Sequence, residues 1–340
     1  MILRKNAAAL LSALALLVLI LDSKTALIGA AAGLSLCLKT VIPSLFPFLF
    51  LCRILMQSLW GNVFPAAANI CRALGIPSGG ESLLIPAFLG GYPAGAQAVA
   101  DGFREGRLTR QEAEHLLTFC SNAGPAFLFG MAALLFSRRT NLWALWCIQI
   151  VSSLLVGLFG KHSVQSRITV HSRPLNLTES LKQTIKTMAT LCGWILLMRT
   201  LIQFLHHWFF WYFPATVQVI MSGILELSNG CCDLSRLPSE SLRFFLCSGF
   251  LSFGGICVLL QTASVIGELS LIPYVYGKII QLILSLILSA GYLLWGWASL
   301  ISVTVILFFF SAMKKDVDFH ESPLYNISIN AGRNQNNVVS

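Results

Sequence analysis

The chain has 340 residues, of which 56% are hydrophobic and only 11% are charged, and its mean hydropathy is +0.76. Soluble domains carry about 25% charged residues, so this composition excludes an ordinary soluble protein and predicts a polytopic membrane protein. The formal net charge of +9 does not indicate nucleic-acid binding, because the basic residues lie in short segments between apolar runs. We expect contact with a lipid bilayer and none with nucleic acid.

A helix needs about 20 apolar residues to cross a bilayer core of about 30 Å. On this criterion we predict an all-α fold with about eight spanning helices and two interrupted apolar segments, which we interpret as re-entrant hairpins. The predicted spans are 7–21, 41–60, 112–136, 141–160, 186–207, 241–265, 274–292 and 294–312. The predicted re-entrant segments are 82–97 and 211–230, and residues 24–40 are expected to form an interfacial helix outside.

The chain divides into five parts on this map. These are an N-terminal span with the interfacial helix (1–40), a first repeat (41–160), a basic cytoplasmic loop (161–185), a second repeat (186–312) and a polar tail (313–340). The first apolar run resembles a signal peptide, but the many spans that follow favour an uncleaved span. The positive-inside rule places the basic loop, Lys278 and the tail in the cytoplasm. Four basic residues contradict this orientation: Arg138, Arg139, Arg236 and Arg243.

The two halves match at four places, in the same order. "LCRILMQSL" (51–59) is similar to "LMRTLIQFL" (197–205), which pairs Arg53 with Arg199 and Gln57 with Gln203. The other matches are "YPAGA" (92–96) with "LSNGC" (227–231), "SNAGP" (121–125) with "LSFGG" (251–255), and polar residues 104–115 with 233–241. The span count makes the two repeats inverted in the membrane. Inverted repeats with broken helices are typical of secondary transporters, which bind substrate near the midplane.

The breaks in the apolar segments are the candidate binding site. Irregular backbone is tolerated at membrane depth only where it is buried in protein or lines a wet cavity. Half-helix N-termini suit carboxylate or phosphate groups, and asparagine both donates and accepts hydrogen bonds. The alternative is that the glycines only allow close helix packing. We favour a substrate site because glycine, proline and asparagine cluster at the breaks of the first half and the pattern recurs in degraded form in the second.

Arg53 and Arg199 are charged residues inside predicted spans, where charge is costly and usually functional. We hypothesise that the two guanidinium groups clasp the two carboxylates of a dianion, with Gln57 and Gln203 beside them. The alternative is that each arginine extends to the membrane interface. Glu226 lies in the second break and is a candidate either for binding a coupling proton or cation, or for capping a half-helix.

At "GGYPAGAQ" (90–97), "REGRLTRQEAEHLLTFCSNAGPAFLFG" (104–130) and "GILELSNGC" (223–231), the chain resembles the sporulation integral membrane protein YlbJ family. The resemblance covers roughly residues 40–310. That family belongs to the nucleoside-recognition gate-domain group, which is similar to the core of concentrative nucleoside transporters. Carried over by motif, the implied site residues are Gly91, Pro93, Gly95, Ser121, Asn122, Pro125, Glu226, Ser228, Asn229 and Gly230.

The resemblance implies a multi-pass protein of endospore-forming bacteria, with two gate-type repeats. It implies a place in the cell membrane, and in the outer forespore membrane during sporulation, where the protein moves dipicolinate, a pyridine dicarboxylate. A nucleoside-like solute is the alternative substrate. The second half departs from the motif, because it has Gly254 and Gly255 but no Asn-x-x-Pro.

The sequence does not indicate an enzyme. It contains no His-x-x-x-His, no Gly-x-Ser-x-Gly and no paired acidic residues within the spans, and the acidic residues near Asp101 are expected in a solvated connector. The adjacent Cys231 and Cys232 suit neither a disulfide nor a metal pair. We therefore expect no metal and no cofactor. A third alternative is a scaffold that binds other sporulation membrane proteins without transporting a solute.

Overall fold

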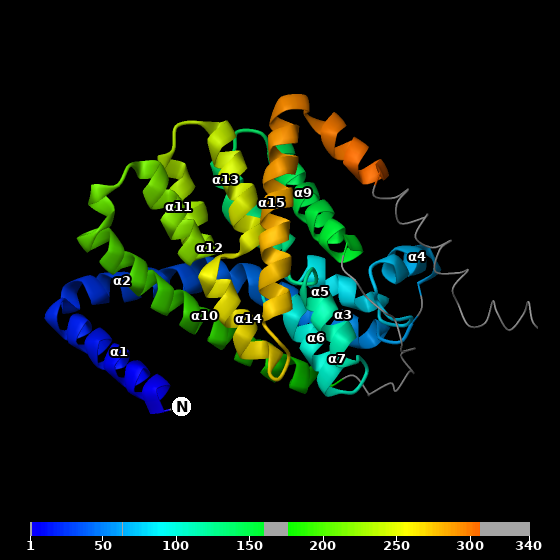
Figure 1. The fold of residues 1–340 in the computed structure, drawn as a ribbon, viewed down its shortest axis with the longest axis horizontal. Coiled ribbons are helices and arrows are strands. Elements are labelled where there is room, and N and C mark those ends of the chain that lie inside the picture. The colour runs from blue at the N-terminus through cyan, green and yellow to red at the C-terminus, as the bar shows by residue number, and fades with distance from the viewer. Residues whose placement is uncertain (1, 63, 160–175, 307–340) are drawn as a thin grey trace, which may run out of the picture.

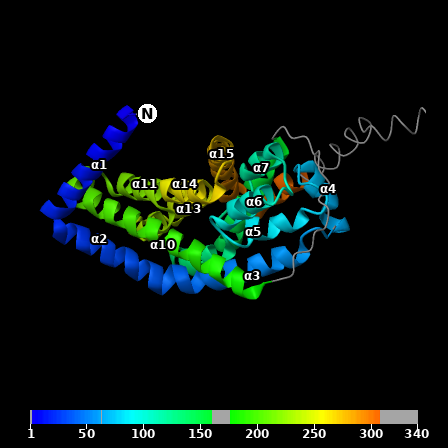
Figure 2. The same cartoon turned by 90° about the horizontal axis from the view of Figure 1, so that it is seen from below.

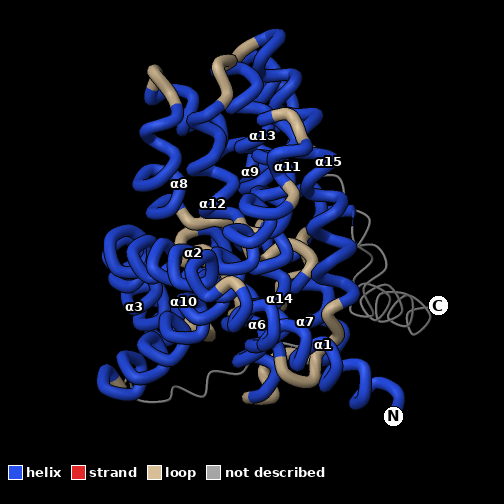
Figure 3. The backbone as a smooth tube through the Cα atoms, turned by 90° about the vertical axis from the view of Figure 1, so that its left-hand side faces the viewer, coloured by secondary structure: helices blue, strands red, loops and turns tan. Residues whose placement is uncertain are grey.

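The computed structural model describes residues 2–62, 64–159 and 176–306. Every regular element in these ranges is a helix (Figure 3). Five helical runs are long and apolar enough to cross a membrane by length and composition: Ser23–Leu59, Arg139–Phe159, Leu177–Trp208, Glu240–Ile266 and Ile272–Trp295. The predicted polytopic helical membrane protein is thus confirmed. The predicted tail and most of the predicted basic loop lie outside the described residues.

The N-terminal half contains a first helix, one long helical run, five short helices and one long helix (Figure 1). After α1 (Ile2–Leu21), the long run joins α2 (Ser23–Leu36), a π-helical turn (Cys37–Val41) and α3 (Ile42–Leu59). There follow α4 (Pro65–Ala73), a 3₁₀ turn (Glu81–Leu83), α5 (Leu84–Phe88), α6 (Ala94–Arg104), α7 (Arg110–Leu117), α8 (Pro125–Met131), a 3₁₀ turn (Ala132–Leu135) and α9 (Arg139–Phe159).

Apart from α1, α4 and the last helix, which have no counterparts, the C-terminal half has the same order of long and short elements. It consists of α10 (Leu177–Trp208), a 3₁₀ turn (Phe210–Tyr212), α11 (Ala215–Leu225), α12 (Leu227–Asp233), a 3₁₀ turn (Leu234–Arg236), α13 (Glu240–Phe253), α14 (Gly255–Ile266), α15 (Ile272–Trp295) and a last helix over Trp297–Ile306. Both halves therefore contain a long helix, two interrupted helices and a second long helix.

The eight predicted spans differ from the five long runs in three places. Residues 24–40 continue into α3 instead of forming a separate interfacial helix, because after Lys24 at their start only Lys39 interrupts their apolar character. Residues 112–136 form α7 and α8, separated by the "SNAGP" break, rather than one helix. The first predicted span lies within α1 and the last corresponds to the apolar helix Trp297–Ile306, neither of which is among the five long runs, and residues 307–312 lie outside the described ranges.

Local sequence explains where the short helices begin. Thr109 and Glu112 form a capping box at the start of α7, in which each side chain accepts a hydrogen bond from the backbone N–H of the other residue. Pro125 is the first residue of α8, a position where the missing N–H of proline costs nothing. Gly254 ends α13 with a φ of 80°, which glycine adopts without the steric penalty of a Cβ.

The run α2–α3 and helix α10 lie side by side and antiparallel along the long axis of the molecule (Figure 2). A Cβ on Gly29 would lie 2.8 Å from the Cα of Thr200, so glycine permits the close approach at one end. At the other end, the Ser180 hydroxyl donates to Gln57 Oε1 over 3.1 Å. The 37-residue run is about 55 Å long, well beyond a bilayer core of about 30 Å, so it crosses obliquely or extends past the membrane.

Candidate functional site

The two breaks of the N-terminal half contact each other through glycine backbone. A Cβ on Gly91, which has a φ of +77°, would lie 3.2 Å from the backbone nitrogen of Gly124. A Cβ on Gly95 would overlap the carbonyl oxygen of Cys120. The glycines predicted at the first break therefore let the α5–α6 and α7–α8 connections cross at backbone distance.

The two breaks of the C-terminal half meet in the same manner. A Cβ on Gly255, which has a φ of +82°, would lie 3.1 Å from the carbonyl oxygens of Gly223 and Ile224. A Cβ on Gly230 would overlap the Cα of Gly223. Close packing, which was the alternative explanation for these glycines, is thus one of their roles in both halves.

A small cavity of about 40 Å³ lies where the breaks of the two halves converge. Its lining comes from the π-helical turn, α3, α10, α14 and the three breaks α5–α6, α7–α8 and α11–α12: Val41, Leu45, Gly91, Tyr92, Ala123, Gly124, Phe127, Leu191, Ile195, Glu226, Leu227, Ser228, Val258 and Gln261. The predicted residues Gly91, Glu226 and Ser228 are brought together here. This volume can hold ordered water but is too small for a pyridine ring. A solute as large as a pyridine ring therefore requires the two halves to separate.

Glu226 caps α12. Its two carboxylate oxygens accept hydrogen bonds from the backbone N–H groups of Ser228, over 2.9 Å, and Asn229, over 2.7 Å. The side chain is only 2% exposed. This is one of the two roles that the sequence left open, and the favourable interaction of a carboxylate with a helix N-terminus accounts for it.

Arg199 reaches the same break from α10. Its Nη1 donates to Asn229 Oδ1 over 2.7 Å. Asn229 is buried, and its Nδ2 has no hydrogen-bond partner within the described residues. A buried N–H donor without a partner is costly, so Asn229 Nδ2 is a predicted site atom with an unused donor at this break.

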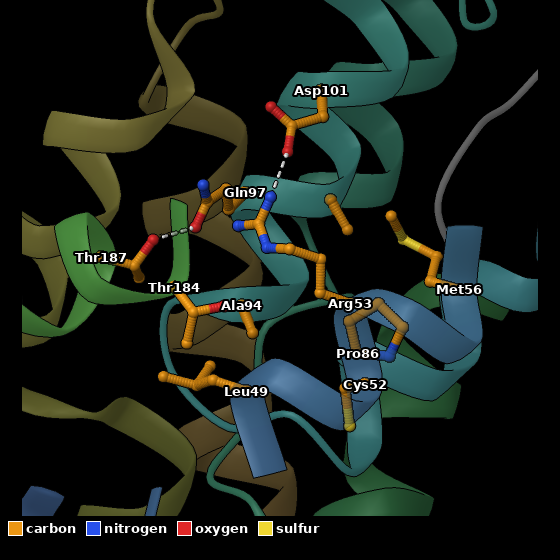
Figure 4. A pocket seen from close by; sticks show the side chains of 11 residues that line it. Leu49, Cys52, Arg53, Met56, Pro86, Ala94, Gln97, Asp101, Thr184 and Thr187 are labelled. Atoms are coloured by element: carbon orange, nitrogen blue, oxygen red, sulfur yellow. Dashed lines mark hydrogen bonds and ion pairs between the residues drawn. The ribbon is translucent and has the colours of Figure 1, made fainter. Parts of the chain in front are cut away.

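Arg53 occupies a separate pocket of about 30 Å³ (Figure 4). Its guanidinium points toward Asp101, with an Nη1–Oδ2 distance of 3.8 Å, and also donates to the side-chain carbonyl of Gln183. Beside it, the Thr187 hydroxyl donates to Gln97 Oε1 over 2.9 Å. Asp101 lies on α6 rather than in the connector that follows it, and its half-buried carboxylate pairs with Arg53 and, over 2.9 Å, with Arg104.

The Arg53 pocket adjoins a wider cavity of about 370 Å³. The two share Gln97, Asp101 and Thr187 in their linings. The wider cavity is bounded mainly by polar and charged side chains, which include Arg104, Glu179, Lys182, Gln183 and Lys186. Arg53 thus lies beside a polar vestibule formed by α6 and the first turns of α10.

The hypothesis that Arg53 and Arg199 together clasp one small dianion is wrong for this conformation. Arg53 contacts Gln183 on α10, which is sixteen residues before Arg199 and therefore about 24 Å away along that helix. The antiparallel packing of the long helices separates the two residues, because matched positions fall toward opposite ends of the pair. Gln57 and Gln203 are separated in the same way, beside Ser180 and Gly29 respectively.

Asn122 is held entirely by protein groups. Its Nδ2 donates to the carbonyl oxygens of Ala87 and Phe119 and contacts the Ser153 hydroxyl, and its Oδ1 accepts from Gln281 over 2.8 Å. Asn122 therefore fastens its break to α9 and α15. Pro93 precedes the first residue of α6 and, with no side-chain donor or acceptor, leaves that helix uncapped.

Lys278 is a functional candidate that the sequence analysis missed. The positive-inside rule placed it in the cytoplasm, but the side chain is 2% exposed and points into the core from α15. Its Nζ donates to the Ser121 carbonyl, to Gln281 Oε1 over 2.7 Å and to the Tyr92 hydroxyl over 3.0 Å. Lys278 lies inside the predicted span 274–292. Charge inside a span is costly and usually functional, and this argument, which singles out Arg53 and Arg199, applies equally to Lys278.

Fold and site together define a multi-pass helical membrane protein whose interrupted helices converge on a central cavity. The chain is similar to sporulation integral membrane protein YlbJ of Bacillus subtilis (strain 168), with 23% identity over 308 aligned residues and 74% of each chain covered. This similarity supports the resemblance stated from the motifs. No protein-family model matches the chain, and no solved structure matches it.

Proposed function

We propose that this chain is a secondary transporter that moves a small organic anion across a bacterial membrane during sporulation. The observation that carries the proposal is the convergence of three helix breaks and of α14, with contributions from both halves, on one cavity. Discontinuous helices around a central site are the recurring construction of secondary transporters. The name of the Bacillus subtilis relative supports the link to sporulation.

An inverted repeat accounts for the arrangement of the two halves. The offset that pairs Arg53 with Arg199 also pairs Leu45 with Leu191, and both leucines line the cavity. The offset that pairs "YPAGA" with "LSNGC" pairs Gly91 with Glu226, and these also line it together. Equivalent residues on opposite walls, and long helices that run antiparallel, are expected when the repeats face one another across a pseudo-two-fold axis.

The chemistry of the breaks favours an anionic solute. Glu226 shows how a carboxylate binds at α12, through two backbone N–H groups. At the equivalent break, α6 begins after Pro93 without a side-chain cap, so a solute carboxylate would take the role there that Glu226 takes at α12. Dipicolinate, a dicarboxylate, is the candidate that the family resemblance supplies. The two arginines would then act at different stages of transport, Arg199 at the site and Arg53 in the vestibule.

Flux into proteoliposomes that contain only this protein tests the proposal. We expect saturable uptake of labelled dipicolinate and none of uridine, with empty liposomes as the blank. Gly91→Val should abolish uptake, because a Cβ at a φ of +77° is strained and crowds Gly124. Gly193→Val is the matched control, because a Cβ on Gly193 meets nothing within 4 Å. Uridine uptake would establish a nucleoside-type carrier, and no uptake of either solute would favour a scaffold.

The proposed location is the cell membrane of a spore-forming bacterium and, during sporulation, the outer forespore membrane. A fluorescent fusion of the full chain, imaged in sporulating cells beside a dye that labels only the outer forespore membrane, tests this part. Fluorescence confined to the inner forespore membrane would contradict it, and would also reverse the direction in which the solute has to move.

A further inference from the structure

The buried lysine on α15 lacks the partner that a charge in a membrane core normally has. Lys278 is 2% exposed, and no carboxylate among the described residues forms an ion pair with it. It lies directly against a helix break, because a Cβ on the preceding Gly277 would overlap the Thr118 carbonyl. A charge in such a position is costly and marks function more often than structure.

The groups around Lys278 resemble the oxygen cage of a bound cation. Three neutral oxygen atoms accept hydrogen bonds from Nζ: the Ser121 carbonyl at the α7–α8 break, the Gln281 side chain on α15 and the Tyr92 hydroxyl at the α5–α6 break. The aromatic faces of Tyr92 and Tyr274 lie 4.9 Å and 5.8 Å from Nζ. Carbonyl groups freed at helix breaks bind the coupling cation in many transporters, and here the ammonium occupies such a place.

Tyr92 allows the site to hold either protonation state. Its hydroxyl accepts from Nζ and donates to the Leu251 carbonyl over 2.9 Å. When Nζ has lost a proton it carries a lone pair, and the same hydroxyl satisfies that lone pair because its hydrogen is then directed to Nζ instead of to Leu251. The neutral amine keeps two N–H groups for Ser121 and Gln281. No buried donor is left without an acceptor in either state.

The Tyr92 hydrogen bond also joins the two halves of the chain. Tyr92 belongs to the first break, whereas Leu251 lies three residues before Gly254 in the last turn of α13. A Cβ on Gly254 would lie 3.3 Å from the Tyr92 ring, so the ring packs directly on that break. Loss of a proton from Lys278 therefore removes a hydrogen bond between the moving parts that the transport proposal requires.

Few other titratable groups approach this site. Tyr92, Tyr274 and Cys120 surround the ammonium from the α5–α6 break, from α15 itself and from the α7–α8 connection. The neighbouring helices α9 and α13 contribute the Gln149 and Leu251 carbonyl groups, which do not titrate. On α7, the acidic and histidine side chains face other partners: Glu112 binds Thr109, Glu114 binds Arg110, and His115 contacts the Leu74 carbonyl.

We propose that Lys278 is the coupling-proton site of this protein, so that transport is linked to protons and does not need sodium. The inference rests on the proposed transport function. The proton leaves through Tyr92, which also lines the central cavity. Nζ transfers one proton to the Tyr92 oxygen while that hydroxyl passes its own proton to a water molecule in the cavity. The ammonium becomes a neutral amine, the water becomes hydronium, and uptake from the other side reverses the step.

The first test measures dipicolinate uptake into proteoliposomes with and without an inward proton gradient, with sodium or choline outside. A gradient of one pH unit supports up to about tenfold accumulation per coupled proton. We express the result as the ratio of dipicolinate uptake with the proton gradient to uptake without it. This ratio should exceed one for the wild type in either salt, and should fall to about one in Lys278→Met and Lys278→Gln. The ratio is taken within each variant, so a lower overall flux does not affect it. Lys24→Met, which removes an exposed lysine from α2, is the control and should keep the wild-type ratio.

A wild-type ratio in both Lys278 variants, or accumulation that follows a sodium gradient, would overturn the proposal. The second test does not depend on transport. It compares the apparent melting temperature of purified wild type and Lys278→Met in detergent between about pH 6 and pH 9. A difference that changes with pH shows that Lys278 exchanges its proton in this range, and a constant difference overturns the inference. If the wild type carries no solute, the transport proposal fails while this second measurement still decides the proton site.

Discussion

Glu226 illustrates how one side chain serves both the fold and the cavity. Its carboxylate stabilises the N-terminus of α12, and the residue also lines the space between the halves. Its repeat counterpart, Gly91, has no side chain to do the same at α6. The two halves are therefore chemically different at these paired positions, because α12 is capped by a carboxylate side chain and α6 has no side-chain cap.

Glu226→Ala removes two buried, charge-assisted hydrogen bonds. We expect the free energy of unfolding to fall by about 2 kcal/mol, seen as a lower apparent melting temperature in detergent. Glu226→Gln retains one acceptor oxygen and should lose less stability, while the ratio of uptake with and without a proton gradient stays at the wild-type value. If Glu226→Gln is stable but its ratio of uptake with and without a proton gradient falls to about one, Glu226 carries the coupling proton and Lys278 does not.

The separation of Arg53 and Arg199 gives a prediction on additivity. Sites more than about 10 Å apart with no shared partner usually contribute independently. The fractional flux of Arg53→Gln/Arg199→Gln should therefore equal the product of the two single-variant fractions, within about twofold. If the double variant has the same flux as the single variant with the lower flux, both guanidinium groups bind the same solute in one step.

At the scale of the elements, glycine on α2 determines how closely the long helices approach. A Cβ on Gly33 would lie 3.1 Å from the Cα of Leu196 and 3.2 Å from the Cβ of Arg199. Small residues at such contacts are the usual means by which membrane helices pack, since lipid provides no hydrophobic force between them. The same contact positions Arg199 against its break.

Gly33→Leu should separate α2 from α10. Overpacking of this kind typically costs about 1–3 kcal/mol, and because Arg199 moves with the helix, transport should fall as well. Gly193→Leu places the same side chain on α10 where a Cβ has open space, and should leave the melting temperature near that of wild type. Equal losses in both variants would indicate general intolerance of leucine in these helices instead of a specific contact.

At the scale of the whole molecule, the antiparallel pair predicts the sidedness of the chain. The start of α2 lies beside the end of α10, where His207 Nε2 is 3.9 Å from Asp22 Oδ2. The end of α3 lies beside the start of α10, where Ser180 binds Gln57. Lys24 and Lys182 are therefore at opposite ends of the pair and, if the pair crosses the membrane, on opposite sides of it.

Labelling with a membrane-impermeant maleimide tests this sidedness. Of the ten cysteines, all in the described part of the chain, Cys232 is exposed and Cys147 and Cys192 are half-buried, so replacement of these three by serine provides an unreactive background. In that background, Lys24→Cys should react from one side of sealed vesicles and Lys182→Cys only from the other. Reaction of both from one side would exclude the inverted arrangement of the two repeats.

Local chemistry allowed much of this molecule to be predicted from its sequence. Apolar composition determines that the chain is a helical membrane protein, because backbone polar groups must be satisfied within the bilayer. Glycine, proline and the capping residues determine where helices break, since these are properties of a few neighbouring residues. The break positions at "YPAGA", "SNAGP", "LSNGC" and "LSFGG" consequently coincide with the observed helix starts.

Only the tertiary structure decided which residues meet. Sequence similarity paired Arg53 with Arg199, but antiparallel packing placed them about 24 Å apart along α10. Statistics of charge placed Lys278 outside the membrane, but the rotation of α15 about its own axis turned that side chain into the core. The distance between two segments and the rotation of a helix about its axis depend on all the contacts that the helix makes along its length. A local pattern of residue types does not determine these contacts.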